Sequence, residues 1–408
     1  MDTDTTTLSP EALRGEMVAK IRKAGYAQLS AVERVLLDTP RHKFLPDADL
    51  ALAYDPWQAV ITHRFEDGRS SSCASAPWLV AAMLDQLHVE PGNRILEIGA
   101  GTGYNACLLA QLTGRADLVT TIDIDPDVAA KARRALAGTG YGDVHMITGD
   151  GGLGYPDHAP YDRMIATVSP WDIPASWWQQ LAPGGRLVAP LRWRGQGRTV
   201  AFTYTDGRLV SDSLHLCGFV YLVGEGEGEL AGPITAEELV TLHWDRDQAV
   251  YLGALRGVLD QPRVTAWAGI TLAPNESHDG LWLRLTVADP RVCRLKVHAD
   301  VPPEVCDPIG GWWRMALVDD DTLVYLTARR VETGAEVCWE LGAIGHGPAA
   351  AALTEYLCDE IRSWAPERDQ HEPTLIVYPA DTPDSELAGP AIDKTNSRFV
   401  LTYDDLST

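Results

Sequence analysis

The segment from Arg94 to Tyr104 constrains what this chain can fold into more than any other part of the sequence. It reads Arg94-Ile-Leu-Glu97-Ile-Gly99-Ala-Gly101-Thr-Gly103-Tyr104, an apolar strand that ends in glycines opening a helix. Glycines permit close approach of the main chain to a ligand, and the N–H groups at the start of a helix are available to bind it. The pattern therefore predicts a strand–turn–helix unit that binds a ligand.

Strands and helices alternate after this segment, and Ala182-Pro183-Gly184-Gly185 is a stop signal before a strand. Alternation with short loops is typical of a parallel sheet with helices on both faces. We therefore expect an α/β, doubly wound, Rossmann-like domain. The predicted strands cover residues 94–98, 118–123, 144–148, 162–167 and 185–190, and the predicted helices cover 104–112, 126–137 and 174–181.

An N-terminal helical segment, residues 9–38, is expected before this domain. It holds one helix over 10–24 and a second that begins at Ser30, where Glu33 completes a capping-box pattern. Residues 39–60 are expected to form a loop. Ser75 can cap a third helix that has Pro77 in its first turn.

The character of the sequence changes after about Gly195, where short β-like runs are separated by turns rich in Pro and Gly. Because 408 residues exceed the usual size of one hydrophobic core, we expect two domains. These are a cofactor domain over residues 1–205 and an α+β accessory domain over residues 206–408. The later strands are predicted over 199–205, 265–271, 281–286, 322–327, 336–342 and 374–378, and a helix over 348–364.

Composition excludes several classes of protein. The formal net charge of −23 argues against nucleic acid as a partner, because phosphate binding needs a basic surface. No apolar run approaches the roughly 18 residues that span a bilayer, and the polar first ten residues contain no secretory signal. The seven cysteines are scattered without zinc spacing. We therefore expect a cytoplasmic protein with no metal site and no membrane contact.

Two acidic residues extend the glycine turn into a cofactor site. Asp123 ends the second strand, 24 residues after Gly99, where a carboxylate can accept both hydroxyls of a ribose. Asp150 ends the third strand, where it can receive an adenine amino group. A nicotinamide dehydrogenase is the competing interpretation. The GxGxG spacing, with Glu97 two residues before the first glycine, resembles instead the turn of methyltransferases.

Several further motifs resemble the protein-L-isoaspartate O-methyltransferases, in family order over about residues 40–190. They are Pro40-Arg41-His42-Lys43-Phe44-Leu45-Pro46, Ala53-Tyr54-Asp55, Cys73-Ala74-Ser75-Ala76-Pro77, Gly149-Asp150-Gly151 and Gly184-Gly185-Arg186-Leu187-Val188. The resemblance implies S-adenosylmethionine as cofactor. It implies cofactor contacts at Glu97, Gly99, Ala100, Gly101, Thr102, Gly103, Tyr104, Asp123, Ile124, Asp150 and Gly151, and substrate contacts at Tyr54, Asp55, Cys73, Ala74 and Ala76.

The sequence departs from that family in two ways. Cys73 and Ala74 replace the family's threonine and isoleucine, so the lip of the pocket differs chemically. The chain also continues for about 200 residues beyond the usual family length. This extension, with Cys217-Gly218-Phe219-Val220 and Ile392-Asp393-Lys394-Thr395-Asn396-Ser397-Arg398, looks like the longer FxLD-type methyltransferases associated with lanthipeptides. That resemblance implies methylation of an aspartate in a ribosomally made, modified precursor peptide, leading to succinimide and isoaspartate.

The chemistry needs positioning more than acid–base groups, because a carboxylate is already ionised at pH 7. We expect Ser75 to hold the substrate carboxylate near the methyl group, although it could also serve only as a helix cap. Arg41 and Lys43 could attract an acidic substrate or lie on a solvated loop. Two other functions stay open: repair of isoaspartyl residues in damaged proteins, and cofactor binding without catalysis.

Overall fold

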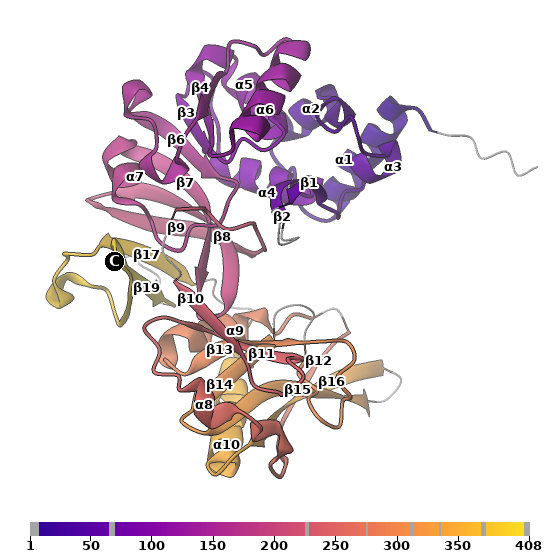
Figure 1. Cartoon of the computed structure of the whole chain (residues 1–408), viewed down its shortest axis with the longest axis vertical. Helices are drawn as coiled ribbons and strands as arrows, with labels where there is room; N and C mark the ends of the chain where they lie inside the picture. Colours follow the sequence, from indigo (N-terminus) through magenta and orange to yellow (C-terminus); the bar gives the residue numbers. More distant parts are fainter. Residues whose placement is uncertain are drawn as a thin grey trace, which may run out of the picture.

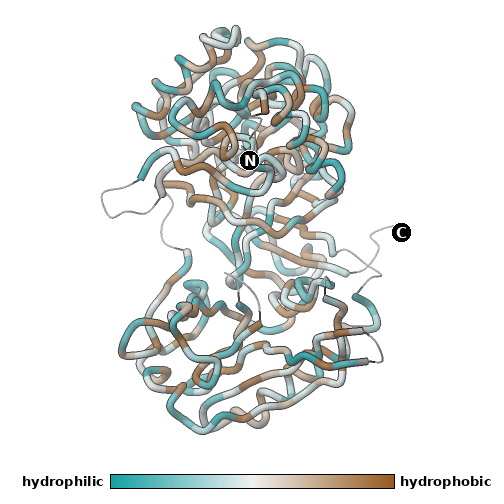
Figure 2. Tube along the Cα trace, turned by 90° about the vertical axis from the view of Figure 1, so that its right-hand side faces the viewer, coloured by the Kyte–Doolittle hydropathy of each residue, from teal (hydrophilic) through white to brown (hydrophobic). Residues whose placement is uncertain are grey.

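The computed structural model describes residues 8–64, 70–224, 228–274, 276–309, 314–333, 336–368 and 373–403. Within this part of the chain lie a ten-stranded sheet, a seven-stranded sheet and a small sheet of β1 (Val60–Arg64) with β2 (Ser70–Ala74). Figure 1 shows the two large sheets one above the other along the long axis, and Figure 2 shows the same two lobes from the side. None of the described helices is long and apolar enough to cross a membrane.

The parallel half of the ten-stranded sheet is the expected α/β unit. Its strands run in the order β5-β4-β3-β6-β7, and neighbouring strands are parallel. They are β5 (His145–Thr148), β4 (Val119–Asp123), β3 (Ile95–Ile98), β6 (Tyr161–Ala166) and β7 (Leu181–Trp193).

Helices cover both faces of this half. Along β3, Ile95 packs into one core and Leu96 into the other, since successive side chains of a strand point to opposite faces. The first core contains α4 (Pro77–Leu87) and α5 (Tyr104–Thr113), and the second contains α7 (Ala175–Gln180). α6 (Pro126–Gly138) packs on β4 and β5. The predicted doubly wound, Rossmann-like fold is confirmed.

The same sheet continues with antiparallel strands that come largely from the far end of the chain. β8 (Gln196–Thr205) follows β7, and then come β9 (Arg208–Leu216), β17 (Thr374–Pro379), β19 (Ser397–Thr402) and β18 (Ala391–Asp393). β17 joins β9 with Ile376 opposite Val210. The sheet therefore crosses the expected domain boundary at residue 205, and the division of the chain into domains stays a prediction.

The second sheet is antiparallel throughout and forms the additional C-terminal domain of sheet and helices. α10 (Ala350–Trp364) covers one face, and α8 (Leu252–Leu255) with the 3₁₀ turn η5 (Val258–Asp260) packs on the other. In sheet order its strands are β10 (Glu229–Pro233), β11 (Val240–Asp245), β13 (Val292–Val297), β14 (Arg314–Asp319), β15 (Thr322–Thr333), β16 (Glu336–His346) and β12 (Val264–Leu272).

The strand predicted over residues 281–286 is wrong, because this segment belongs to helix α9 (Asp279–Ala288). Leu281 and Leu285 pack into the core of the second sheet, whereas Leu283 packs into the core of the first. A helix that buries apolar residues on two sides has no polar face. The apolar stripe of 3.6-residue spacing by which amphipathic helices are identified is therefore missing from this segment.

The N-terminal helices appear as expected, as α1 (Pro10–Lys23) and α2 (Ser30–Asp38). The predicted capping box at Ser30 is wrong, since the N-cap of α2 is Leu29 and no side chain caps it. The Asp85 carboxylate of α4 lies there instead and accepts hydrogen bonds from the N–H groups of Gln28 (2.8 Å) and Leu29 (3.1 Å). The expected loop after α2 also contains a 3₁₀ turn, η1 (Arg41–Phe44), and a short helix, α3 (Leu50–Ala53).

The turn between β7 and β8 joins the two sheets. Arg194 and Gly195 both have positive φ (47° and 78°), and Trp193 pairs with Gln196 across the turn. Two central residues with positive φ suit a tight hairpin. A Cβ at Gly195 would lie 2.6 Å from the Cβ of Arg294 in β13, so glycine lets the hairpin tip press against the second sheet.

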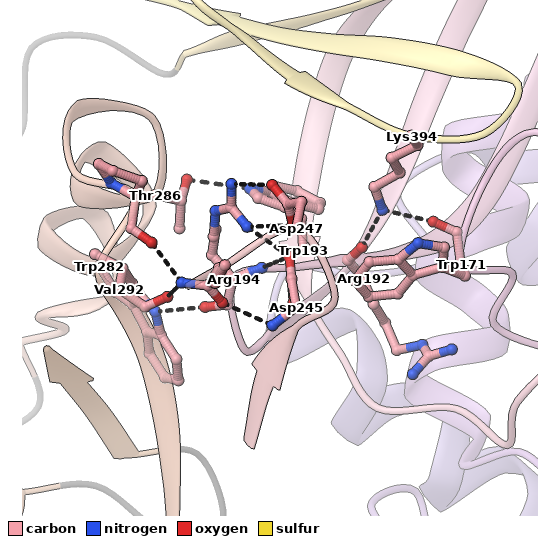
Figure 3. Close-up of polar contacts among 12 residues, drawn as sticks. Trp171, Arg192, Trp193, Arg194, Asp245, Asp247, Trp282, Thr286, Val292 and Lys394 are labelled. Atoms are coloured by element: carbon pink, nitrogen blue, oxygen red, sulfur yellow. Dashed lines mark hydrogen bonds and ion pairs between the residues drawn. The ribbon is translucent and has the colours of Figure 1, made fainter. Parts of the chain in front are cut away.

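Hydrogen bonds fix this hairpin tip to helix α9 and to the end of strand β11 (Figure 3). The indole N–H of Trp193 donates to the hydroxyl of Thr286 in α9 (3.1 Å). The backbone N–H of Arg194 donates to the carboxylate of Asp245 (2.7 Å), and its guanidinium donates two bonds to Asp247 (2.7 and 2.6 Å). Burial raises the pKa of Asp245 to about 6.

Candidate functional site

The glycine turn after β3 is held in a conformation that side chains would disrupt. Gly99 has φ +93°, and a Cβ there would lie 2.7 Å from the hydroxyl oxygen of Thr167 and 2.9 Å from a methyl group of Val168. Gly101 has φ +52°, and its missing Cβ would contact the carbonyl oxygen of Cys73 at 3.6 Å. The turn therefore lies between the end of β6 and the end of β2, with its main chain open to a ligand.

Asp123 stands at the carboxyl end of β4 and faces this turn. Its carboxylate accepts hydrogen bonds from the N–H of Gly101 (3.0 Å) and from the N–H of Asp125 (3.1 Å), one on each oxygen. Burial raises the pKa of this carboxyl above its usual range. Each oxygen keeps a further lone pair, so the oriented carboxylate can accept the two hydroxyls of a ribose.

A cavity opens above the turn and the acid. Of the expected cofactor residues, Gly99, Gly101, Asp123, Ile124 and Gly151 line it. Ile124 is 46% exposed, whereas Gly151 lies so close to Ile98 that a Cβ would come within 2.4 Å of its side chain. Small residues, exposed apolar side chains and one oriented carboxylate suit an adenosine group, and the residues present therefore fit S-adenosylmethionine.

Glu97 does not line that cavity. Its carboxylate is fully buried and accepts hydrogen bonds from the amide of Asn105 (2.8 Å) and the hydroxyl of Thr121 (2.5 Å). Burial raises the pKa of Glu97 to about 7. The side chain connects β3 with β4 and α5 underneath the turn, so the structure assigns it a supporting position.

The remaining expected cofactor residues support the turn from behind or lie at its side. Ala100 and Gly103 are buried, and a Cβ at Gly103 would lie 3.3 Å from the Ala132 carbonyl of α6, so this glycine allows close helix packing. The Thr102 hydroxyl accepts a bond from the N–H of Tyr104 (3.4 Å). The ring of Tyr104 is buried beneath Arg41 and Phe44, away from the cavity.

Arg41 is buried, so the interpretation that it lies on a solvated loop is wrong. Its guanidinium donates hydrogen bonds to the carbonyl groups of Ala53 (3.0 Å), Ala74 (3.4 Å) and Ser75 (2.7 Å). It also lies 4.9 Å above the ring of Tyr104. This one side chain joins three segments around the mouth of the site: η1, α3 and the link from β2 to α4.

Ser75 lies in that link, half-buried, two residues after Cys73. It does not cap α4, because the N-cap is Ala76 and no side chain caps the helix. Cys73 lines the cavity, and burial raises the pKa of its thiol, so it is a neutral wall rather than a nucleophile. Ser75 itself does not line the cavity, its carbonyl is held by Arg41, and its role at the reaction centre stays a prediction.

The other expected substrate residues do not line the cavity. The Tyr54 hydroxyl bonds to the Nδ1 atom of His42 (2.7 Å), and the Asp55 carboxylate accepts a bond from the N–H of Trp57 (2.8 Å). Ala74 and Ala76 are buried around Ser75. These residues shape the segments on either side of Ser75, and their contact with substrate stays a prediction.

A segment that sequence reasoning did not assign to the site closes it on the far side. Val220, Tyr221, Leu222 and Val223 line the cavity together with Thr167 and Val168. The segment is fixed to the end of β6, since the N–H of Ser169 donates to the Val220 carbonyl (2.7 Å) and the Leu222 N–H donates to the Ser169 carbonyl (2.9 Å). Phe219-Val220 was visible in the sequence, but a single short apolar run does not indicate a cofactor wall.

A second, larger cavity of about 750 Å³ adjoins the first. Leu222 and Val223 line both cavities. Asp150, expected near the adenine, lines the larger one, and one of its oxygens accepts a bond from the N–H of Gly152 (2.8 Å). Among the described residues, no group of three or more His, Cys, Asp or Glu side chains could hold a metal ion.

Comparisons with known proteins agree with this geometry. The family model "Protein-L-isoaspartate(D-aspartate) O-methyltransferase" matches residues 12–227. A protein-L-isoaspartate O-methyltransferase of Hyperthermus butylicus is 38% identical over 221 residues, which are 52% of this chain and 89% of the relative. Another from Methanopyrus kandleri is 36% identical over 214 residues, 52% of this chain and 92% of the relative.

Solved structures of the same description are also similar. One protein-L-isoaspartate O-methyltransferase aligns with 95% of this chain and 99% of its own, at 19% identity and a TM-score of 0.49. A putative one from Plasmodium falciparum, in complex with S-adenosyl-L-homocysteine, aligns with 52% of this chain and 99% of its own, at 18% identity and a TM-score of 0.46.

Proposed function

The chain belongs to the protein-L-isoaspartate(D-aspartate) O-methyltransferase family and is an S-adenosylmethionine-dependent carboxyl O-methyltransferase; from this premise, we propose that it esterifies an aspartate side chain of a ribosomally synthesised, modified peptide of the lanthipeptide kind. After esterification, attack by the next backbone nitrogen releases methanol and gives a succinimide, whose hydrolysis gives isoaspartate. The observation that carries this proposal is the larger cavity, which residues of the extension build beside the cofactor site.

The cofactor supplies, when bound, a methyl group on a positively charged sulfur. We assign the ribose to Asp123, whose carboxylate is already oriented by Gly101 and Asp125. The main chain at Gly99 and Gly101 allows close approach, and we assign the adenine to Asp150 and Gly151, of which Gly151 lines the cofactor cavity and Asp150 the larger one. A preformed site of this kind costs little reorganisation when the cofactor binds.

Ser75 is proposed to position the substrate carboxylate. No residue needs to remove a proton, because an aspartate is ionised at pH 7. What the chain must supply is alignment, and Arg41 fixes the Ser75 backbone through its carbonyl group. Cys73, a neutral thiol on the cavity wall, adds an apolar boundary next to that position.

A second candidate is repair of isoaspartyl residues in damaged proteins. It is favoured by the curated relatives, which are named protein-L-isoaspartate O-methyltransferases and are matched over about nine-tenths of their length. Repair requires a site open to any damaged segment. A lobe of 200 further residues beside the site is not needed for that task, and this favours a dedicated peptide.

One experiment separates the two candidates. The purified protein is incubated with labelled S-adenosylmethionine and either an isoaspartyl test peptide or the cyclised peptide encoded beside its gene. Mass spectrometry then follows the gain of a methyl ester and the net loss of one water that marks the succinimide. Reaction of the cyclised peptide alone supports peptide tailoring. Reaction of the isoaspartyl peptide alone overturns it in favour of repair.

A further inference from the structure

We propose that the 750 Å³ cavity between the two lobes binds the part of the substrate peptide that flanks the methylated residue, with a preference for cationic side chains in that flank. The inference rests on the proposed peptide substrate and assigns a place for its recognition. Part of the cavity lining, at residues 228, 246–247 and 393–396, lies outside the match to the family model at residues 12–227.

The position of this cavity favours a substrate segment over an unrelated ligand. Leu222 and Val223 form a wall that it shares with the cofactor cavity. The other walls come from Leu153 and Trp171 of the cofactor domain, and from the segment that precedes β19, at residues 393–396. A peptide whose aspartate lies at the cofactor therefore has this hollow next to it, on the side where the extension meets the α/β unit.

The walls are fixed before any ligand binds. The Asp172 carboxylate accepts bonds from the N–H groups of Asn396 (2.5 Å) and Ile173 (2.7 Å). The ammonium group of Lys394 donates to the carbonyl groups of Trp171 and Arg192, both at 2.5 Å, as Figure 3 shows. A preformed hollow of this volume lies within the range of ligand sites, roughly 300–1,000 Å³, and binding to it orders few side chains.

Apolar side chains stand open in this hollow. Leu153 is 66% exposed and Val223 is 47% exposed, although both are large aliphatic residues. Trp171 lines the same hollow, with its ring 3.9 Å from the Lys394 ammonium. Contiguous exposed apolar side chains are uncommon on folded proteins, and where they occur they often mark a binding surface. They can receive the aliphatic parts of a peptide.

The charges of the lining favour a cationic flank. Four carboxylates line the cavity, at Asp150, Asp172, Asp247 and Asp393, against two cationic side chains, and Arg194 and Arg398 pair with Asp247 and Asp393 from outside the lining. One of the two lining cations, Lys394, points its ammonium at two carbonyl groups of the wall. The side chain of Asp393 is 65% exposed, and the whole chain carries a net charge of −23. Complementary charge then selects lysine or arginine over glutamate in the flank.

The test compares versions of the cyclised peptide that differ only in their flanks, with two lysines or two glutamates placed three to six residues from the target aspartate on either side. We expect wild-type kcat/KM to be about fivefold higher for the lysine peptide at low ionic strength, as expected for a few partly exposed ion pairs. Asp393→Lys is expected to abolish or invert this ratio. Because the ratio compares two peptides on one protein, a general loss of folded enzyme leaves it unchanged.

Asp384→Lys is the matched control. Asp384 and Asp393 both pair with Arg398, but only Asp393 lines the cavity. The control should keep the wild-type ratio. A wild-type ratio near one, or a ratio that Asp393→Lys leaves unchanged, overturns the proposal. If neither peptide is methylated, the proposed function fails, and binding of fluorescently labelled peptides with S-adenosylhomocysteine present still measures the ratio and decides on the cavity.

Discussion

Glu97 is a carboxyl group that folding removes from water, and its stability effect has a definite sign. In the unfolded chain it ionises near 4.5, whereas burial raises its folded pKa to about 7. Between these pH values the folded protein binds more protons than the unfolded chain, so the free energy of unfolding rises as the pH falls from about 7 to about 5. The hydrogen bonds from Asn105 and Thr121 offset only part of the cost of the buried charge.

Glu97→Gln should remove this slope. As the pH is lowered from 8 to 5, the free energy of unfolding of wild type should rise relative to that of the variant by on the order of 2 kcal/mol. Urea unfolding at several pH values measures this difference. Glu16→Gln, on the exposed face of α1, is the control and should follow wild type at every pH. Parallel curves for wild type and Glu97→Gln would contradict the buried ionisation.

Asp123→Asn tests the ribose assignment. The variant keeps the shape of the side chain but turns one acceptor oxygen into a donor beside the N–H of Gly101 or the cofactor. Loss of a charged hydrogen-bond acceptor should raise the Kd for S-adenosylhomocysteine about 10- to 100-fold, measured by calorimetry. Asp127→Asn, exposed in the first turn of α6, should leave the Kd unchanged. An unchanged Kd in Asp123→Asn would exclude the assignment.

Residue spacing was sufficient to place part of the site. Gly99 and Gly101 follow β3 and Asp123 ends β4 at one sheet edge, so they line the cavity, and the sequence reveals this through strand–glycine and strand–acid patterns. The same patterns cannot tell which way a side chain turns. Glu97 and Tyr104 belong to the motif, yet both point into the core.

At the scale of elements, Arg41 joins three segments that local sequence patterns cannot connect. η1, α3 and the link between β2 and α4 each lack the length or periodicity of a stable element. Their common support is one guanidinium that satisfies carbonyl groups of Ala53, Ala74 and Ser75. Its five donors in a fixed planar arrangement suit this role, whereas a lysine would not reach all three.

Arg41→Met should therefore lower both stability and catalysis. We expect a loss of about 2–4 kcal/mol in the free energy of unfolding, since buried carbonyl groups lose their donor. At a temperature where the variant stays folded, kcat should fall as the backbone of Ser75 becomes less fixed. Lys43→Met, exposed on the same 3₁₀ turn, should change stability by less than about 0.5 kcal/mol. Equal melting temperatures for the two variants would refute the anchoring role.

The elements of the parallel half were predictable, and helix α9 was not. The strands and helices of the parallel half lie within a few residues of their predicted bounds, because hydrophobic period and glycine turns agree there. α9 was mistaken for a strand because Leu281, Leu283 and Leu285 serve two different cores.

At the scale of the whole molecule, local sequence patterns did not show that the chain returns to the first sheet after building the second. β17 and β19 return to extend the first sheet after the chain has built the second, more than 150 residues after β9. Such pairing depends on side-chain packing across the sheet rather than on any signal in the strand itself. The extension is therefore tied to the methyltransferase unit through these strands, through the bonds of Lys394 and Asn396 to Trp171 and Asp172, and through the hairpin tip at Arg194.

The hairpin tip makes the coupling between the lobes testable. Arg194→Met keeps the backbone N–H that bonds to the buried carboxylate of Asp245, but it removes the guanidinium that pairs with Asp245 (3.4 Å) and with Asp247. Removing one partner of a buried pair costs about 3–5 kcal/mol. Since the pair joins the two sheets, we expect scanning calorimetry to show one transition for wild type and two for Arg194→Met.

Asp247→Asn is the control for that variant, because its side chain is 41% exposed and pairs with the same guanidinium. It should cost less than about 1 kcal/mol and keep one transition. A single, unshifted transition in Arg194→Met would mean that the guanidinium of Arg194 is not needed to couple the lobes. A split transition would mean that the docked hairpin tip is what makes the two lobes unfold together.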